Sequence, residues 1–157
     1  MKLTKRLKEM VKRTIFYFRR EELFFTALAI EAARYGFKVE RGREVIYLSQ
    51  NGLTFIVNFC PKYSPAEDDY LDIALEQKYD RDTDLAECLM DAQLVKQITN
   101  ELNDDGIFEI ENKQDVVTLA RKLTKQIDAF GKKKGALIKS GNWNRDKQQI
   151  LASTKNI

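Results

Sequence analysis

The dipeptide Asn51-Gly52 constrains the fold of this chain more than any other feature, because it separates two stretches rich in β-forming residues. Residues 43–50 alternate in side-chain character, and residues 53–60 read LTFIVNFC. Both central residues of a type I′ turn need a positive φ, which asparagine and glycine tolerate best. The sequence therefore predicts a β-hairpin with antiparallel strands.

Residues 70–80 predict a further strand, because apolar and polar side chains alternate along them. One face would carry Leu71, Ile73, Leu75 and Tyr79, and the other Asp72, Ala74, Glu76 and Lys78. A period of two is typical of a half-buried strand. If instead a helix began near Ser64 and continued, residues 65–80 would be helical. Residues 37–40 predict another short strand before the hairpin.

Residues 3–35 predict helical structure, because their apolar positions recur every three or four residues. These positions are Leu3, Leu7, Met10, Val11, Thr14, Phe18, Phe25, Leu28, Ala32 and Tyr35. Gly36 is well placed to end the helix in the left-handed conformation. The charged cluster at residues 19–22 could mark a break, so one long helix and two shorter ones both remain open.

Two more helices are predicted after the strands. The first, capped by Asp84, would bury Leu85, Cys88, Leu89, Ala92, Val95, Ile98 and Leu102. After a brief strand at 107–110, the second would start at Asn112, bury Val116, Leu119, Ala120, Leu123, Ile127 and Phe130, and end at Gly131. The expected fold is therefore α+β, with an N-terminal helix or two and an antiparallel meander of three to four strands. It comprises one domain over residues 1–131 and a basic, partly ordered tail over 132–157.

Histidine is absent from the 157 residues, and this excludes many catalytic classes. Histidine-assisted nucleophiles and nearly all ordinary zinc sites need that side chain. We therefore expect no cofactor and favour a protein that is not an enzyme. No apolar run is long enough to span a bilayer, and the basic start lacks the apolar core of a secretory signal. These features favour a cytoplasmic protein without a membrane partner.

Charge is distributed unevenly along the chain. Residues 1–61 carry a net charge of +6, residues 62–112 carry −11 and residues 113–157 carry +8. Basic ends around an acidic middle indicate either internal pairing or a surface that faces a polyanion. For the second case, the candidate nucleic-acid-binding residues are Lys5, Arg6, Lys12, Arg13, Lys132, Lys133, Lys134, Lys139, Trp143 and Arg145, with Trp143 stacking on a base.

The sequence Glu76-Gln77-Lys78, placed on a strand after a helix and a hairpin, resembles the last element of the PD-(D/E)XK nuclease core. The resemblance implies a Mg²⁺-dependent nuclease in which Glu76 binds the metal and Lys78 orients water. Glu31 on the first helix would then be an accessory carboxylate, and Asp72, the remaining acidic candidate, lies on the same strand as Glu76, which is not the family's geometry. The family also takes a metal-binding aspartate from the neighbouring strand, whereas residues 45–59 contain no acid.

Three functional hypotheses follow from these patterns. The leading one is a non-enzymatic accessory or regulatory protein that binds a nucleic-acid-handling machine, or nucleic acid itself without sequence preference, through its basic ends. The second is the nuclease, with Mg²⁺ as its cofactor. The third is an inhibitor or adaptor that binds protein through its aromatic and acidic surfaces. Oligomeric state is not predicted by any of these patterns.

Overall fold

The computed structural model describes residues 4–60, 70–76, 85–104 and 110–154 of the chain. The fold is α+β, as the sequence predicts, with one helix, four strands and then further helices. The elements in chain order are α1 (Lys5–Arg34), β1 (Lys38–Arg41), β2 (Val45–Gln50), β3 (Leu53–Cys60), β4 (Tyr70–Leu75), α2 (Leu85–Asp104), α3 (Lys113–Asp128), α4 (Phe130–Lys139) and α5 (Asn142–Thr154). Within the described residues, no helix is long and apolar enough to cross a membrane.

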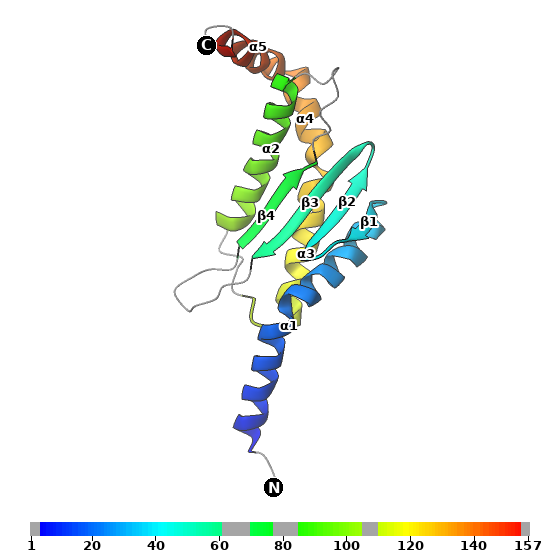
Figure 1. Cartoon of the computed structure of the whole chain (residues 1–157), viewed down its shortest axis with the longest axis vertical. Helices are drawn as coiled ribbons and strands as arrows, with labels where there is room; N and C mark the ends of the chain where they lie inside the picture. Colours follow the sequence, from blue (N-terminus) through cyan, green and yellow to red (C-terminus); the bar gives the residue numbers. More distant parts are fainter. Residues whose placement is uncertain (1–3, 61–69, 77–84, 105–109, 155–157) are drawn as a thin grey trace.

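The four strands form one antiparallel meander in the order β1-β2-β3-β4 (Figure 1). Asn51 and Gly52 have φ values of 52° and 78°, and Gln50 pairs with Leu53, so the predicted hairpin is confirmed. Residues 70–75 form a strand, which rules out the helical alternative over that range. Tyr79 and Lys78 lie outside the described residues.

Substituting Gly52 by valine tests this turn. A Cβ atom at Gly52 would meet no other atom within 4 Å, so the cost comes from the left-handed backbone alone. We expect Gly52→Val to lower the free energy of unfolding, measured by urea denaturation, by about 1–2 kcal/mol. Gly131 also has open space around its Cβ position but lies in α4. Gly131→Ala should therefore stabilise by about 0.5–1 kcal/mol, and destabilisation by both variants would contradict this assignment.

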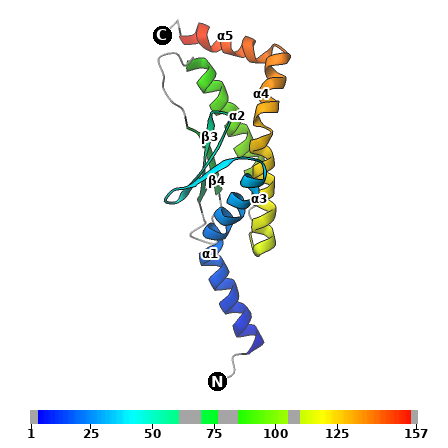
Figure 2. The same cartoon turned by 90° about the vertical axis from the view of Figure 1, so that its right-hand side faces the viewer.

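One face of the sheet packs against helices, and none of the described elements covers the other, which we call the open face. Phe59 on β3 contacts Phe24 of α1, with ring centroids 5.3 Å apart, and Phe55 meets Phe130 of α4 edge-on at 5.5 Å. On the opposite face, Ala74 is exposed and its partner Ile56 is half-buried. Figure 2 shows α3 and α4 on the same side of the sheet. The alternation predicted for residues 71–75 thus places the apolar side chains on the packed face.

Helix α1 is continuous, which settles the alternative left open by the sequence. The segment at residues 19–22 contains only good helix formers, and Glu22 accepts a 2.8 Å hydrogen bond from Arg41 of β1. Arg20 is buried, with its guanidinium 4.1 Å above the Tyr17 ring. Gly36 ends the helix with φ of 84°, as predicted.

The two halves of α1 differ in burial. Phe24, Phe25, Leu28 and Ala32 are buried, whereas the apolar stripe of the first half is exposed. Its members Leu7, Met10, Val11, Ile15 and Phe18 are all more than 40% exposed, and Phe18 reaches 79%. Figure 1 shows this half extending beyond the sheet and the other helices. The periodicity predicts the amphipathic helix correctly, but no other described element covers this part of it.

The stripe predicted for α2 is wrong in its first turns. Leu85, Leu89 and Ala92 are exposed, and the buried positions are instead Ala86, Met90 and Leu94. Both sets have helical spacing, so the sequence alone does not distinguish them. The structure selects the second set because Glu87 and Asp91, on the adjoining side, bind Lys134 of α4. The predicted Asp84 cap lies outside the described residues.

The predictions for α3 are confirmed at its start and along its stripe. The Asn112 side chain accepts from the Asp115 backbone N–H at 3.0 Å, and the predicted apolar positions from Val116 to Phe130 are buried. Gly131 does not end the helix, because α4 begins at Phe130 and runs through it. In this C-terminal region a left-handed φ, of 82°, belongs to Gly141, between α4 and α5. Ile110 is buried but not in a strand, and residues 107–109 are not described.

The segment expected as a partly ordered tail forms α4 and α5. Trp143 on α5 is only 3% exposed, and its Nε1–H donates to Glu87 Oε2 of α2 at 2.9 Å. Lys134 contacts Glu87 and Asp91 at 2.8 and 2.9 Å, and its Nζ lies 5.0 Å from the centroid of the Trp143 ring. These contacts tie the basic C-terminal helices to the acidic α2.

Candidate nucleic-acid interface

The two basic ends of the chain lie at opposite ends of the molecule. In Figures 1 and 2, the start of α1 stands at one end of the long axis and α5 at the other. The predicted candidates near the N-terminus and those after residue 131 therefore do not form one continuous surface. Each group therefore forms a surface of its own.

Much of the C-terminal positive charge is neutralised within the molecule. Lys134 binds Glu87 and Asp91, Lys147 lies 3.4 Å from Glu87, and Lys133 lies 3.6 Å from Glu101. Arg145 lies 3.7 Å from its neighbour Asp146, while Lys132 and Lys139 are exposed. Internal pairing, one of the two interpretations of the charge pattern, therefore applies to this end.

Burial makes Trp143 unsuitable for the role predicted from the sequence. Its ring is 3% exposed and lies beside Lys134, so in this structure it has no free face on which a base could stack. The sequence suggested exposure because Trp143 stands among basic residues. The structure shows instead that Lys134 and Lys147 pair with Glu87 of α2, which also accepts from the Trp143 ring nitrogen.

The N-terminal end retains its charge. We define the N-terminal arm as residues 5–19 of α1. All its charged residues are exposed, namely Lys5, Arg6, Lys8, Glu9, Lys12, Arg13 and Arg19. Among the residues that the structure describes, none of these six basic side chains forms an ion pair. A rod with six cations and one anion attracts polyanions.

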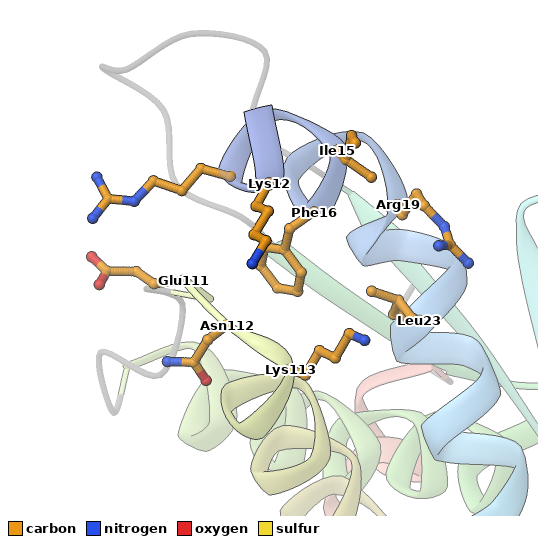
Figure 3. Close-up of a pocket in the computed structure, with 9 residues that line it drawn as sticks. Lys12, Ile15, Phe16, Arg19, Leu23, Glu111, Asn112 and Lys113 are labelled. Carbon is orange, nitrogen blue, oxygen red and sulfur yellow. The ribbon is translucent and has the colours of Figure 1, made fainter. Parts of the chain in front are cut away.

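The arm meets the start of α3 at a cleft of about 540 Å³. Four basic side chains line this α1–α3 cleft, namely Lys12, Arg13, Arg19 and Lys113. Its apolar lining comes from Ile15, Phe16 and Leu23 of α1, and Glu111 is its acidic member. Figure 3 shows Lys12 and Phe16 pointing from α1 toward residues 111–113, and Lys113 pointing back toward α1.

The cleft is held in shape by contacts on both sides. Asp115 Oδ2 accepts from the Glu111 backbone N–H at 2.9 Å, which completes a reciprocal cap with Asn112. Further along, Arg121 of α3 donates to Glu31 of α1 at 3.4 Å, so the two helices run side by side in the same direction. Lys12 and Arg13 are predicted from the sequence as site residues, whereas Phe16 and Lys113 are not. Only the packing of α1 on α3 brings them together.

The carboxylates of the nuclease hypothesis do not meet in the structure. Asp72 and Glu76 are exposed on or beside the open face of β4, whereas Glu31 is buried on the helical side. Glu31 instead accepts from Arg34 at 2.8 Å and from Arg121. Lys78 lies outside the described residues. Within the described ranges, no group of three or more Cys, Asp or Glu side chains is arranged to hold a metal ion.

Comparison with protein-family models, curated proteins and solved structures gives no match. The arm and the cleft are therefore the features that bear on function.

Proposed function

We propose that this protein is a non-enzymatic accessory protein that binds nucleic acid, without sequence preference, through the N-terminal arm. The observation that carries the proposal is the arm itself, with six exposed basic side chains, one acidic side chain and no intramolecular partner for the basic ones among the described residues. Lysine and arginine that neutralise phosphates release condensed counterions, and this release drives binding without reading the bases. Such a protein would work in the cytoplasm beside a larger nucleic-acid-handling machine.

The salt dependence of binding tests this proposal. If the arm neutralises about four phosphates, the logarithm of the affinity should fall with the logarithm of salt concentration at a slope near −3 for single strands. Substituting Lys5, Arg6, Lys12 and Arg13 by glutamine should flatten that slope, because four of the six basic side chains of the arm are removed. The measurement is a titration of a labelled oligonucleotide at several salt concentrations.

A variant of equal charge provides the control. Lys96, Lys125, Lys132 and Lys139 are exposed and lie outside the arm, so replacing these four by glutamine removes the same charge. The control variant should keep most of the slope. An equal loss of slope in both variants would show that binding depends on the net charge of the protein and not on the arm. Absence of binding by the wild type at low salt would refute the proposal.

The exposed apolar stripe of the arm favours a second candidate, an adaptor that docks on a partner protein. Nucleic-acid contacts through lysine and arginine leave Leu7, Met10 and Phe18 unused, and clustered exposed apolar side chains often mark protein interfaces. Co-purification from expressing cells, with and without nuclease treatment, separates the candidates. A partner lost on nuclease treatment supports nucleic acid, and a partner retained then but lost in Phe18→Ser supports the adaptor.

A further inference from the structure

The α1–α3 cleft differs from the rest of the arm in the kind of ligand that it fits. Along the outer part of the arm, the basic side chains surround a convex helix and can only touch phosphates from outside. The cleft is concave, and its volume of about 540 Å³ lies within the range of about 300–1,000 Å³ that is usual for small-ligand sites. It is therefore large enough to hold one unit of a larger ligand.

The lining of the cleft combines an aromatic surface with positive charge. Phe16 is half-buried, so part of its ring is accessible from the cleft, and Leu23 extends the apolar lining. Lys12 and Lys113 approach the same space from opposite walls (Figure 3). With Arg13, Arg19 and Glu111 included, the lining has a net charge of +3. A matching ligand has a flat apolar part and at least one negative charge.

A nucleotide unit has this chemistry only when its base is unpaired. Bases stack on aromatic rings without sequence preference, since every base has a π-face. In a duplex, the bases are stacked on each other and only the phosphates are accessible to the arm. A base in the cleft must therefore come from a single strand or from an unpaired end.

We infer that the α1–α3 cleft binds one unpaired nucleotide, with its base against Phe16 and its phosphates between Lys12 and Lys113. This inference rests on the proposed function and adds to it a preference for single strands over duplex. The convex part of the arm supplies charge to either form. The cleft supplies the preference for single strands over duplex.

The experiment compares Phe16→Leu with Phe18→Leu, the same substitution two residues further along α1. Leucine keeps the apolar character of the site but removes the π-face. Phe18 is 79% exposed and does not line the cleft, so its variant is a matched control. Each protein is titrated with a fluorescent oligothymidine of about ten nucleotides and with a duplex of equal length, at one salt concentration. Thermal unfolding of both variants checks that the fold is retained.

We expect the wild type to prefer the single strand, and Phe16→Leu to weaken single-strand binding about five- to tenfold while duplex binding stays unchanged. Phe18→Leu should change neither. Lys113→Gln, at an exposed position, should also weaken single-strand binding more than duplex binding.

Two results would overturn the inference and leave the proposed function intact: equal affinity for the two forms, or equal effects of the two phenylalanine variants, with the salt slope preserved. Failure of the wild type to bind either nucleic acid at low salt would remove the proposed function as well. An anionic lipid also has a negative charge and an apolar part, so a parallel titration with phosphatidylserine vesicles tests this alternative ligand. Vesicle binding that Phe16→Leu reduces, without any single-strand preference, would assign the cleft to an anionic lipid.

Discussion

Replacing Trp143 by alanine is expected to lower the free energy of unfolding by about 3 kcal/mol, near the lower end of the range for buried tryptophan and phenylalanine. The side chain is 3% exposed, and its Nε1–H donates to Glu87 at 2.9 Å. Truncation removes the buried ring and leaves Glu87 without one of its donors. Urea denaturation followed by far-UV circular dichroism measures the change.

Two further observations make this test specific. Trp143→Phe retains an aromatic ring but loses the indole donor, so its cost should be smaller, about 1 kcal/mol. Trp143 is also the chain's single tryptophan, so its fluorescence should shift to longer wavelength when the protein unfolds. An unchanged stability in Trp143→Ala, or emission already typical of exposed tryptophan in the native protein, would show that α5 does not pack on α2.

Lys134→Met is expected to have the second-largest effect, a loss of about 2 kcal/mol at pH 7. Methionine keeps most of the length of the unbranched side chain but leaves Glu87 and Asp91 without the cation that they share. Breaking a fully buried ion pair costs about 3–5 kcal/mol, and we expect less here because 24% of the Lys134 side chain is exposed. Lys132→Met, at an exposed position two residues earlier, should change stability by less than about 0.5 kcal/mol.

The difference in stability between the wild type and Lys134→Met should depend on pH with a defined sign. Burial alone would lower the pKa of Lys134, but its hydrogen bonds to Glu87 and Asp91 raise that pKa above the ordinary value of 10.5. A raised pKa in the folded state gives stability that is complete below the ordinary value and is lost as the pH rises through the raised pKa. The wild type's advantage over Lys134→Met should therefore shrink at strongly alkaline pH.

At acidic pH, the pH dependence of stability follows from the two carboxyl groups, Glu87 and Asp91. Burial favours a raised pKa for Glu87, but hydrogen bonds from Lys134, Trp143 and Lys147 bring it below its ordinary value. Its contribution to stability is therefore lost as the pH falls through that lowered pKa. Burial raises the pKa of Asp91, and its titration has the opposite sign. An advantage of the wild type that stays constant across the whole pH range would contradict the ion-pair assignment.

The sheet could be predicted from sequence because its signals are local. The Asn51-Gly52 turn determines which residues of β2 and β3 face each other, and the alternation along β4 determines which face is buried. The start of α3 is equally local, since Asn112 and Asp115 are three residues apart. Each of these features depends on neighbours in the chain and needs no knowledge of distant contacts.

The C-terminal helices and the orientation of α2 could not be predicted in the same way. Their basic and acidic residues look like solvated surface in isolation, but Glu87 and Lys134, 47 positions apart in the chain, neutralise each other in the fold. The α1–α3 cleft has the same origin, because Phe16 and Lys113 meet only when the two helices pack together. Contacts over such separations leave no periodic signal in the sequence.

The first strand of the sheet also has a consequence for solubility. Strand β1 is at one edge of the meander, where unpaired backbone groups could recruit a strand of another molecule and start aggregation. It is only four residues long, and three of them, Lys38, Glu40 and Arg41, are charged. Arg41 is held by Glu22 and by the face of the Phe25 ring, with its guanidinium 4.1 Å from the ring centroid. A short, charged edge of this kind discourages strand-by-strand growth at β1.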